Sequence, residues 1–172
     1  MAEPRILVLG VGNTLMGDDG VGVYAVQALS ERYDLPAHVR VVDGGVAGLR
    51  LLSEIATADY MIIVDAMKHG GEAGMIQRFH GNEIIPRRGP LVSAHEGGIA
   101  ELLATAEFTG QLPPTDIIGV EPLSVDTVVL ELSPPLSCAL PQVIAAIVEL
   151  LQARGVALNE KSQPTLSEPF HA

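Results

Sequence analysis

The sequence predicts a single three-layer α/β domain: a doubly wound, mostly parallel central sheet with helices on both faces and one antiparallel edge strand. Short apolar runs alternate with amphipathic stretches along the chain, which is the pattern of successive strand–helix–strand units. The first apolar run passes directly into a glycine-rich loop and then into helical spacing, as doubly wound domains begin. The 172 residues, 48% of them apolar, suffice for one core.

The first half of the chain contains three predicted strands. Ile6–Leu9 is a short apolar run, and the helix after it should extend from about Gly20 to Tyr33, where apolar side chains recur at three and four. His38–Asp43 alternates and is rich in valine, which predicts the second strand. Ala47–Ala56 is a short amphipathic stretch, so we expect a helix. Asp59–Asp65 predicts the third strand, which ends in an aspartate.

The second half continues the alternation. Gly74–His80 reads as an edge strand, Ile99–Phe108 as a helix and Thr115–Val120 as a further strand. For Val125–Leu132 the periodicity favours a strand, with a loop as the alternative. The final helix is expected over Ser137–Ala153, where apolar residues again recur at three and four.

The domain should therefore comprise residues 1–155, and the polar, proline-containing residues 156–172 are expected to form a disordered tail. The N-terminus lacks the features of a signal peptide, and no apolar run approaches the ~18 residues that span a bilayer. The single cysteine, Cys138, allows no internal disulfide and fits a reducing cytoplasm. We expect a cytoplasmic monomer without a membrane partner.

A net charge of −11 argues against nucleic acid as a partner, because phosphates would be repelled. The glycine-rich loop does not fit a nucleotide either. Gly10 and Gly12 lack the third glycine of the dinucleotide fingerprint, no lysine precedes Lys68, and Asp18 and Asp19 would repel a pyrophosphate. The sequence thus predicts no nucleotide cofactor; a metal cation or a basic protein segment is the expected partner.

Acidic side chains follow three of the predicted strands. Asp18 and Asp19 come after the first strand, Asp43 after the second and Asp65 after the third, while His95 precedes a helix. In a doubly wound sheet these positions converge on one edge, where carboxylates and an imidazole suit a divalent transition metal. Structural roles remain open: either loop aspartate could cap the first helix, Asp43 or Asp65 could shape a turn, and His95 could bond the backbone.

Five segments carry a resemblance to a known family. In chain order they are GVGNTLMGDDGVG, DGGVAGLRLL, DYMIIVDAM, HEGGIAELLATAEFTG and IIGVEP. They resemble the hydrogenase maturation endopeptidases, which remove the C-terminal extension from the large-subunit precursor of [NiFe]-hydrogenases. The resemblance covers residues 5–153 and implies a metal-dependent or aspartyl-type hydrolase.

The resemblance also implies roles for particular residues. Asp19, Asp65 and His95 match the nickel-contacting positions, the first of which is often glutamate in the family. Asp43 matches an Asp-Gly motif linked to cleavage or substrate handling, so we assign it a catalytic role and assign Gly44 and Gly45 to substrate binding. Nickel is expected to arrive on the thiolates of the precursor, the protein partner. The alternative is a non-catalytic nickel-binding chaperone for hydrogenase assembly.

Overall fold

The computed structural model describes residues 2–80, 92–93 and 99–162. Its central sheet is parallel except at β5, an antiparallel edge strand beside β7, and at β6 (Val92–Ser93), which pairs antiparallel with the end of β4. This confirms the predicted class. The spatial order is β3 (Val39–Gly45), β1 (Ile6–Val11), β4 (Tyr60–Lys68), β7 (Thr115–Val120) and β5 (Ile76–His80).

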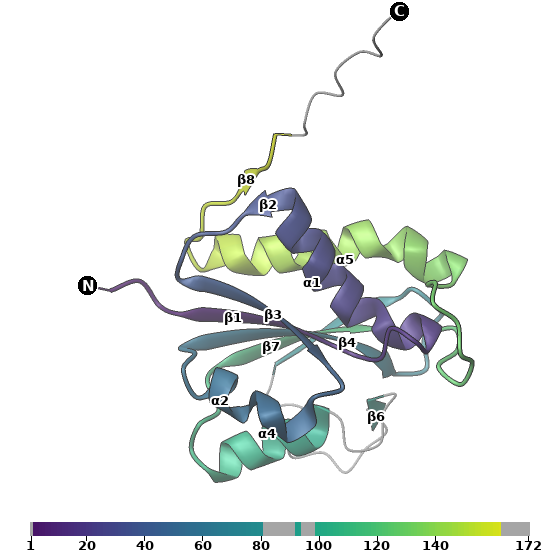
Figure 1. The fold of residues 1–172 in the computed structure, drawn as a ribbon, viewed down its shortest axis with the longest axis horizontal. Helices are drawn as coiled ribbons and strands as arrows, with labels where there is room; N and C mark the ends of the chain where they lie inside the picture. Colours follow the sequence, from purple (N-terminus) through teal and green to yellow (C-terminus); the bar gives the residue numbers. More distant parts are fainter. Residues whose placement is uncertain (1, 81–91, 94–98, 163–172) are drawn as a thin grey trace, which may run out of the picture.

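Helices cover both faces of the sheet and complete the three layers (Figure 1). On one face lie α1 (Val21–Arg32) and α5 (Pro134–Ala153), and on the other lie α2 (Leu52–Ile55) and α4 (Ile99–Phe108). Two short 3₁₀ helices precede α1 and α2 directly, namely η1 (Gly17–Gly20) and η2 (Gly48–Leu51). The helix expected over residues 47–56 is therefore present as η2 followed by α2.

The apolar run of β1 is buried because both faces of the sheet are covered. Ile6 and Val8 belong to the core on the α1 and α5 side, whereas Leu7 and Leu9 belong to the core on the α2 and α4 side. Successive side chains of a strand point to opposite faces, so a strand covered on both sides must be apolar throughout. The prediction of a buried opening strand is confirmed.

β4 extends beyond Asp65, where the sequence predicted its end. Ala66 pairs with Val120 of β7, and Met67 and Lys68 pair with β6, so neighbours on either side take up the backbone hydrogen bonds. Asp65 accordingly lies inside a strand rather than after one. Strand length was set here by the available pairing partners and not by the aspartate.

The strand favoured over Val125–Leu132 was wrong, and the loop alternative holds. A strand needs neighbours for its backbone groups, and here only Val129 forms a bridge, to Met16. The chain instead runs as a loop from Glu121 to Ser133, and α5 begins at Pro134, three residues earlier than expected, with proline in its first turn.

Among the described helices, α5 is the one long and apolar enough to cross a membrane. Its stripe of Val143, Ile147 and Leu151 is buried in the core shared with α1, as in the core helix of a globular domain. Val156 N donates to Leu151 O at 3.1 Å and Gly155 has φ +82°, so the helix ends in a glycine cap.

The segment after α5 returns to the domain. β8 (Asn159–Glu160) pairs antiparallel with β2 (Tyr33–Asp34). Lys161 N donates to Arg32 O at 2.8 Å, and Arg32 pairs with Glu160 at 2.9 Å. Of the tail expected over 156–172, residues 159–161 thus lie against the end of α1, while residues 163–172 lie outside the described residues.

Removing residues 159–172 is expected to lower the melting temperature by about 2–4 °C, because the β2–β8 pairing is worth about 1 kcal/mol in a chain of this size. The exposed Arg32–Glu160 pair adds little. Thermal denaturation followed by circular dichroism measures the shift. A control chain that ends at Ser162 keeps these contacts and should have the melting temperature of the full chain. If the full chain, the control and the chain without residues 159–172 all had the same melting temperature, β8 would contribute nothing to stability.

Candidate active site

The predicted site residues lie around the carboxyl ends of β1 and β4. β1 is hydrogen-bonded to β3 on one side and to β4 on the other. The chain leaves β1 through α1 to reach β3 on one side, and later crosses to β4 on the other side. The connections therefore diverge between β1 and β4. Ligands of doubly wound proteins bind at this switch point, outside the carboxyl ends of the strands.

Asp19 lies on η1 and is 4% exposed. Its Oδ2 accepts a hydrogen bond from Asn13 N at 2.8 Å, which ties the carboxylate to the start of its own loop. Gly12, with φ +133°, has room for no side chain, since a Cβ would lie 1.8 Å from Asp19 O. The glycine loop therefore folds tightly around this aspartate and fixes its direction.

Asp65 is fully buried, at 0% exposure, although it is ionisable. In β4 it follows Val64, which pairs with Gly10 at the end of β1. The η1 helix, which carries Asp19, contacts β4. The structure thus brings the elements of Asp19 and Asp65 together at the predicted edge. His95 lies outside the described residues, and within the described ranges no three metal-ligating side chains form a cluster.

Asp18 does not cap a helix, one of the roles left open by the sequence. Neither η1 nor α1 has a side-chain cap hydrogen bond. The carboxylate, 2% exposed, accepts from Leu123 N at 2.8 Å and from Ser133 N and Oγ at 2.7 and 2.8 Å. One buried side chain of the glycine loop therefore holds both ends of the loop 123–133.

Asp43 is exposed and lies near the end of β3, where it pairs with Gly10, and not after the strand as the sequence predicted. Its Oδ1 accepts from Gly45 N at 3.0 Å and its Oδ2 from Gln27 Nε2 at 3.2 Å. Gln27 belongs to α1, so the Asp43 side chain faces the α1 side of the sheet. Asp65 points to the opposite face of the sheet, because its neighbours in β4, Val64 and Ala66, belong to the core on the α1 side. The bond to Gly45 N, two residues along the chain, is the kind by which an aspartate shapes the backbone at the end of a strand. The catalytic role stays a prediction, as does substrate binding by Gly44, which is buried, and by Gly45, which has φ +46°.

Two further polar side chains at this edge were not singled out from the sequence. His69 Nδ1 lies 3.2 Å from Oε2 of Glu121, and both side chains are nearly buried. The same carboxylate accepts His69 N at 2.7 Å and joins the end of β4 to the end of β7. An acid at the end of a predicted strand was the signal used for Asp43, and it applies equally to Glu121.

A separate polar cluster lies at the opposite edge, where β4 and β7 begin. Tyr60 donates a hydrogen bond to Asp116, whose other oxygen contacts His80. Burial raises the pKa of Tyr60 well above its usual value, and the hydrogen bond to Asp116 raises this pKa further. The phenol therefore remains protonated and serves as a donor, away from the predicted site.

Comparisons with known proteins identify relatives along nearly the whole chain. A family model described as HycI, hydrogenase maturation protease, matches residues 23–150. The hydrogenase 2 maturation protease of Escherichia coli K12 is 39% identical over 151 residues, which cover 84% of this chain and 92% of that protein. The hydrogenase expression/formation protein HupD of Rhizobium leguminosarum bv. viciae is 34% identical over 169 residues, which cover 97% of this chain and 84% of that protein.

The fold agrees with these relatives. The structure of the hydrogenase maturating endopeptidase HybD from E. coli matches with a TM-score of 0.82 at 33% identity, covering 91% of this chain and 98% of that one. The family model spans well over half of the chain, and relatives above 30% identity align along most of it. The protein is therefore an endopeptidase that belongs to the hydrogenase maturation protease family.

Proposed function

We propose that this endopeptidase removes the C-terminal extension from the large-subunit precursor of a [NiFe]-hydrogenase after nickel insertion. The observation that carries the proposal is the placement of Asp19 and Asp65: both are buried, and their elements meet at the β1–β4 switch point. That edge is where substrates of doubly wound proteins bind. The family and the names of its relatives supply the class of substrate.

Nickel belongs to the substrate in this proposal. Carboxylate oxygens and imidazole are suitable ligands for a divalent transition metal, and the donor set at this edge is of that kind. Asp19 and Asp65 with His95 would complete the coordination of a nickel ion that the precursor's thiolates already hold. The bound ion would polarise a nearby carbonyl.

The chain's own contribution is to hold these carboxylates in place before the substrate arrives. Asn13 N fixes Asp19 by a hydrogen bond of 2.8 Å, and the β4 backbone fixes Asp65. Two carboxylates close together in a partly dry site repel by about 1–4 kcal/mol, and an arriving cation offsets this repulsion. A nickel-loaded precursor would be seated more tightly than an empty one, which makes nickel a recognition element.

The state of the single thiol supports a proposed compartment. Cys138 is exposed and free, and exposed free thiols persist in reducing surroundings. We place the protein in the cytoplasm, as a monomer that acts on the precursor without nucleic acid or membrane.

The proposal predicts that Asp19→Asn and Asp65→Asn each slow cleavage by more than about 100-fold, since each removes a charged ligand while keeping the size of the side chain. Nickel-loaded and nickel-free precursors are incubated with each variant, and the product is identified by mass. Asp34→Asn, at an exposed position on β2 beyond the far end of α1, is the control and should cleave at the wild-type rate. Near-normal cleavage by both site variants would contradict the proposed ligands.

The same incubation tests the remaining alternatives. A wild-type protein that binds the nickel-loaded precursor but never shortens it would be a nickel chaperone. Asp43→Asn tests the assigned catalytic role: a fall in kcat with unchanged precursor binding supports it, whereas an unchanged kcat leaves Asp43 with the turn alone.

A further inference from the structure

The loop between β7 and α5 displays large apolar side chains to solvent. Leu123, Val128 and Leu130 are 63%, 75% and 65% exposed. Leu15, at 56% exposure, joins them because Val129 N donates to Leu15 O at 3.1 Å. We call Leu15, Leu123, Val128 and Leu130 the apolar tip. Apolar side chains gathered in this way mark sites of protein contact.

Polar contacts hold the apolar tip in one shape. Asp18 binds the loop at Leu123 and Ser133. Between these ends, Gly17 N donates to Val129 O at 2.6 Å, and the Tyr24 hydroxyl donates to Leu130 O, also at 2.6 Å. A surface that is ordered before a partner arrives loses less conformational entropy on binding. The loop is thus built to present its apolar side chains.

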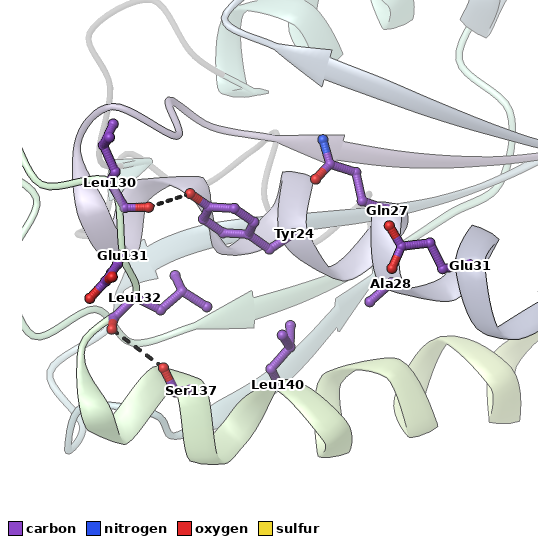
Figure 2. A pocket seen from close by; sticks show the side chains of 9 residues that line it. All are labelled: Tyr24, Gln27, Ala28, Glu31, Leu130, Glu131, Leu132, Ser137 and Leu140. Carbon is purple, nitrogen blue, oxygen red and sulfur yellow. Dashed lines mark hydrogen bonds between the residues drawn. The ribbon is translucent and has the colours of Figure 1, made fainter. Parts of the chain in front are cut away.

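A groove of about 540 Å³ continues from the apolar tip between α1 and α5 (Figure 2). Leu130 and Leu132 close one end, and Ala28 and Leu140 lie on the two helices. Leu130 belongs to both features, so the tip and the groove form one continuous surface. This surface adjoins the loop that carries Asp19, since Gly17 is bonded to Val129.

The groove is acidic. Glu31 of α1 and Glu131 of the loop both line it, no lysine or arginine does, and neither carboxylate forms an ion pair within the described ranges. Two other exposed carboxylates, Glu149 and Glu160, are in contrast paired with arginine. The groove therefore complements a cationic side chain that lies beside apolar ones.

We propose that the apolar tip and the groove dock one segment of the hydrogenase precursor, in which aliphatic side chains neighbour a lysine or arginine. The proposal rests on the proposed function for the identity of the partner and adds a second contact outside the Asp19–Asp65 site. The aliphatic side chains cover Leu130 and Val128, and the cation lies between Glu31 and Glu131. Docking places the precursor's extension at the adjoining carboxyl edge of the sheet.

The test uses the full chain and a nickel-loaded precursor. Val128→Ser with Leu130→Ser removes the apolar contact, and Glu31→Lys with Glu131→Lys reverses the charge of the groove. Each pair should raise KM and the dissociation constant by roughly tenfold or more while kcat is unchanged. The matched controls lie on α4: Phe108→Ser, at a side chain that is 92% exposed, and Glu107→Lys. Both should leave KM, the dissociation constant and kcat unchanged.

Added salt should weaken binding of the wild type and spare the Glu31→Lys, Glu131→Lys variant. Wild-type KM in both variant pairs would overturn the docking surface, as would a fall in kcat alone. A protein that sediments as a dimer and becomes monomeric on Val128→Ser would assign the surface to a second copy and overturn the proposal. If the wild type binds the precursor without cutting it, the proposed function fails, while a weaker affinity of the variants still supports docking.

Discussion

Replacing Gly22 by alanine is expected to lower the free energy of unfolding by more than about 3 kcal/mol, because there is no space for a methyl group between α1 and the sheet. A Cβ at Gly22 would lie 2.1 Å from Val64 O and 2.4 Å from Val11 O. Both contacts are with backbone of the central strands, which cannot turn away as a side chain could. A Cβ at Gly10 would likewise lie 2.2 Å from Gly22 O.

The same close approach positions the site. Gly22 lies in the first turn of α1, directly after η1, so a displaced helix would move Asp19 relative to Asp65. We therefore expect the alanine variant to lose precursor cleavage even at temperatures where it remains folded. Urea denaturation measures the stability, and the cleavage assay measures the displacement.

Gly48→Ala is the matched control for this substitution. Gly48 has φ +53°, and a Cβ at this position would have no neighbour within 4 Å, so alanine there meets conformational strain but no clash. The expected cost is about 1–2 kcal/mol. Equal destabilisation by Gly22→Ala and Gly48→Ala would show that the helix can move aside and that the added methyl group meets no rigid backbone.

Replacing Asp18 by alanine is expected to destabilise the protein by about 3 kcal/mol, because a buried carboxylate that accepts three hydrogen bonds is lost at once. The donors left behind are Leu123 N, Ser133 N and Ser133 Oγ. Bonds to a charged group are the stronger kind, and buried donors without a partner are costly. The loop 123–133 should detach at both ends, which also disorders the apolar tip.

Chemical denaturation checks the stability, and proteolysis of the native protein checks the loop, since a released loop is cut sooner. Asp126→Ala is the control: Asp126 is exposed on the same loop and should change the stability by less than about 0.5 kcal/mol. An Asp18→Ala protein as stable as this control would contradict the clamp. Loss of cleavage through KM, with kcat retained, would connect the clamp to docking rather than to chemistry.

The sequence by itself determined the strands β1, β3, β4, β7 and β5 of the central sheet, the main helices and the edge to which the elements of Asp19 and Asp65 belong. These features have local causes. An apolar run as short as Ile6–Leu9, followed by glycines, favours a strand covered on both faces, and a glycine-rich loop between strand and helix permits the close approach seen at Gly10 and Gly22. Five motifs in order also sufficed to identify the family, as the comparisons confirmed.

Only the tertiary structure decided what particular polar residues do. Asp18 could cap a helix by every local rule, yet its partners are 105 and 115 residues further along the chain. Val125–Leu132 has the periodicity of a strand, but only Val129 finds a strand-like backbone neighbour. β4 continues past Asp65 because β6 and β7 offer pairing there. Local sequence specifies which conformations are favourable, whereas hydrogen-bond partners distant in the chain determine which of them is kept.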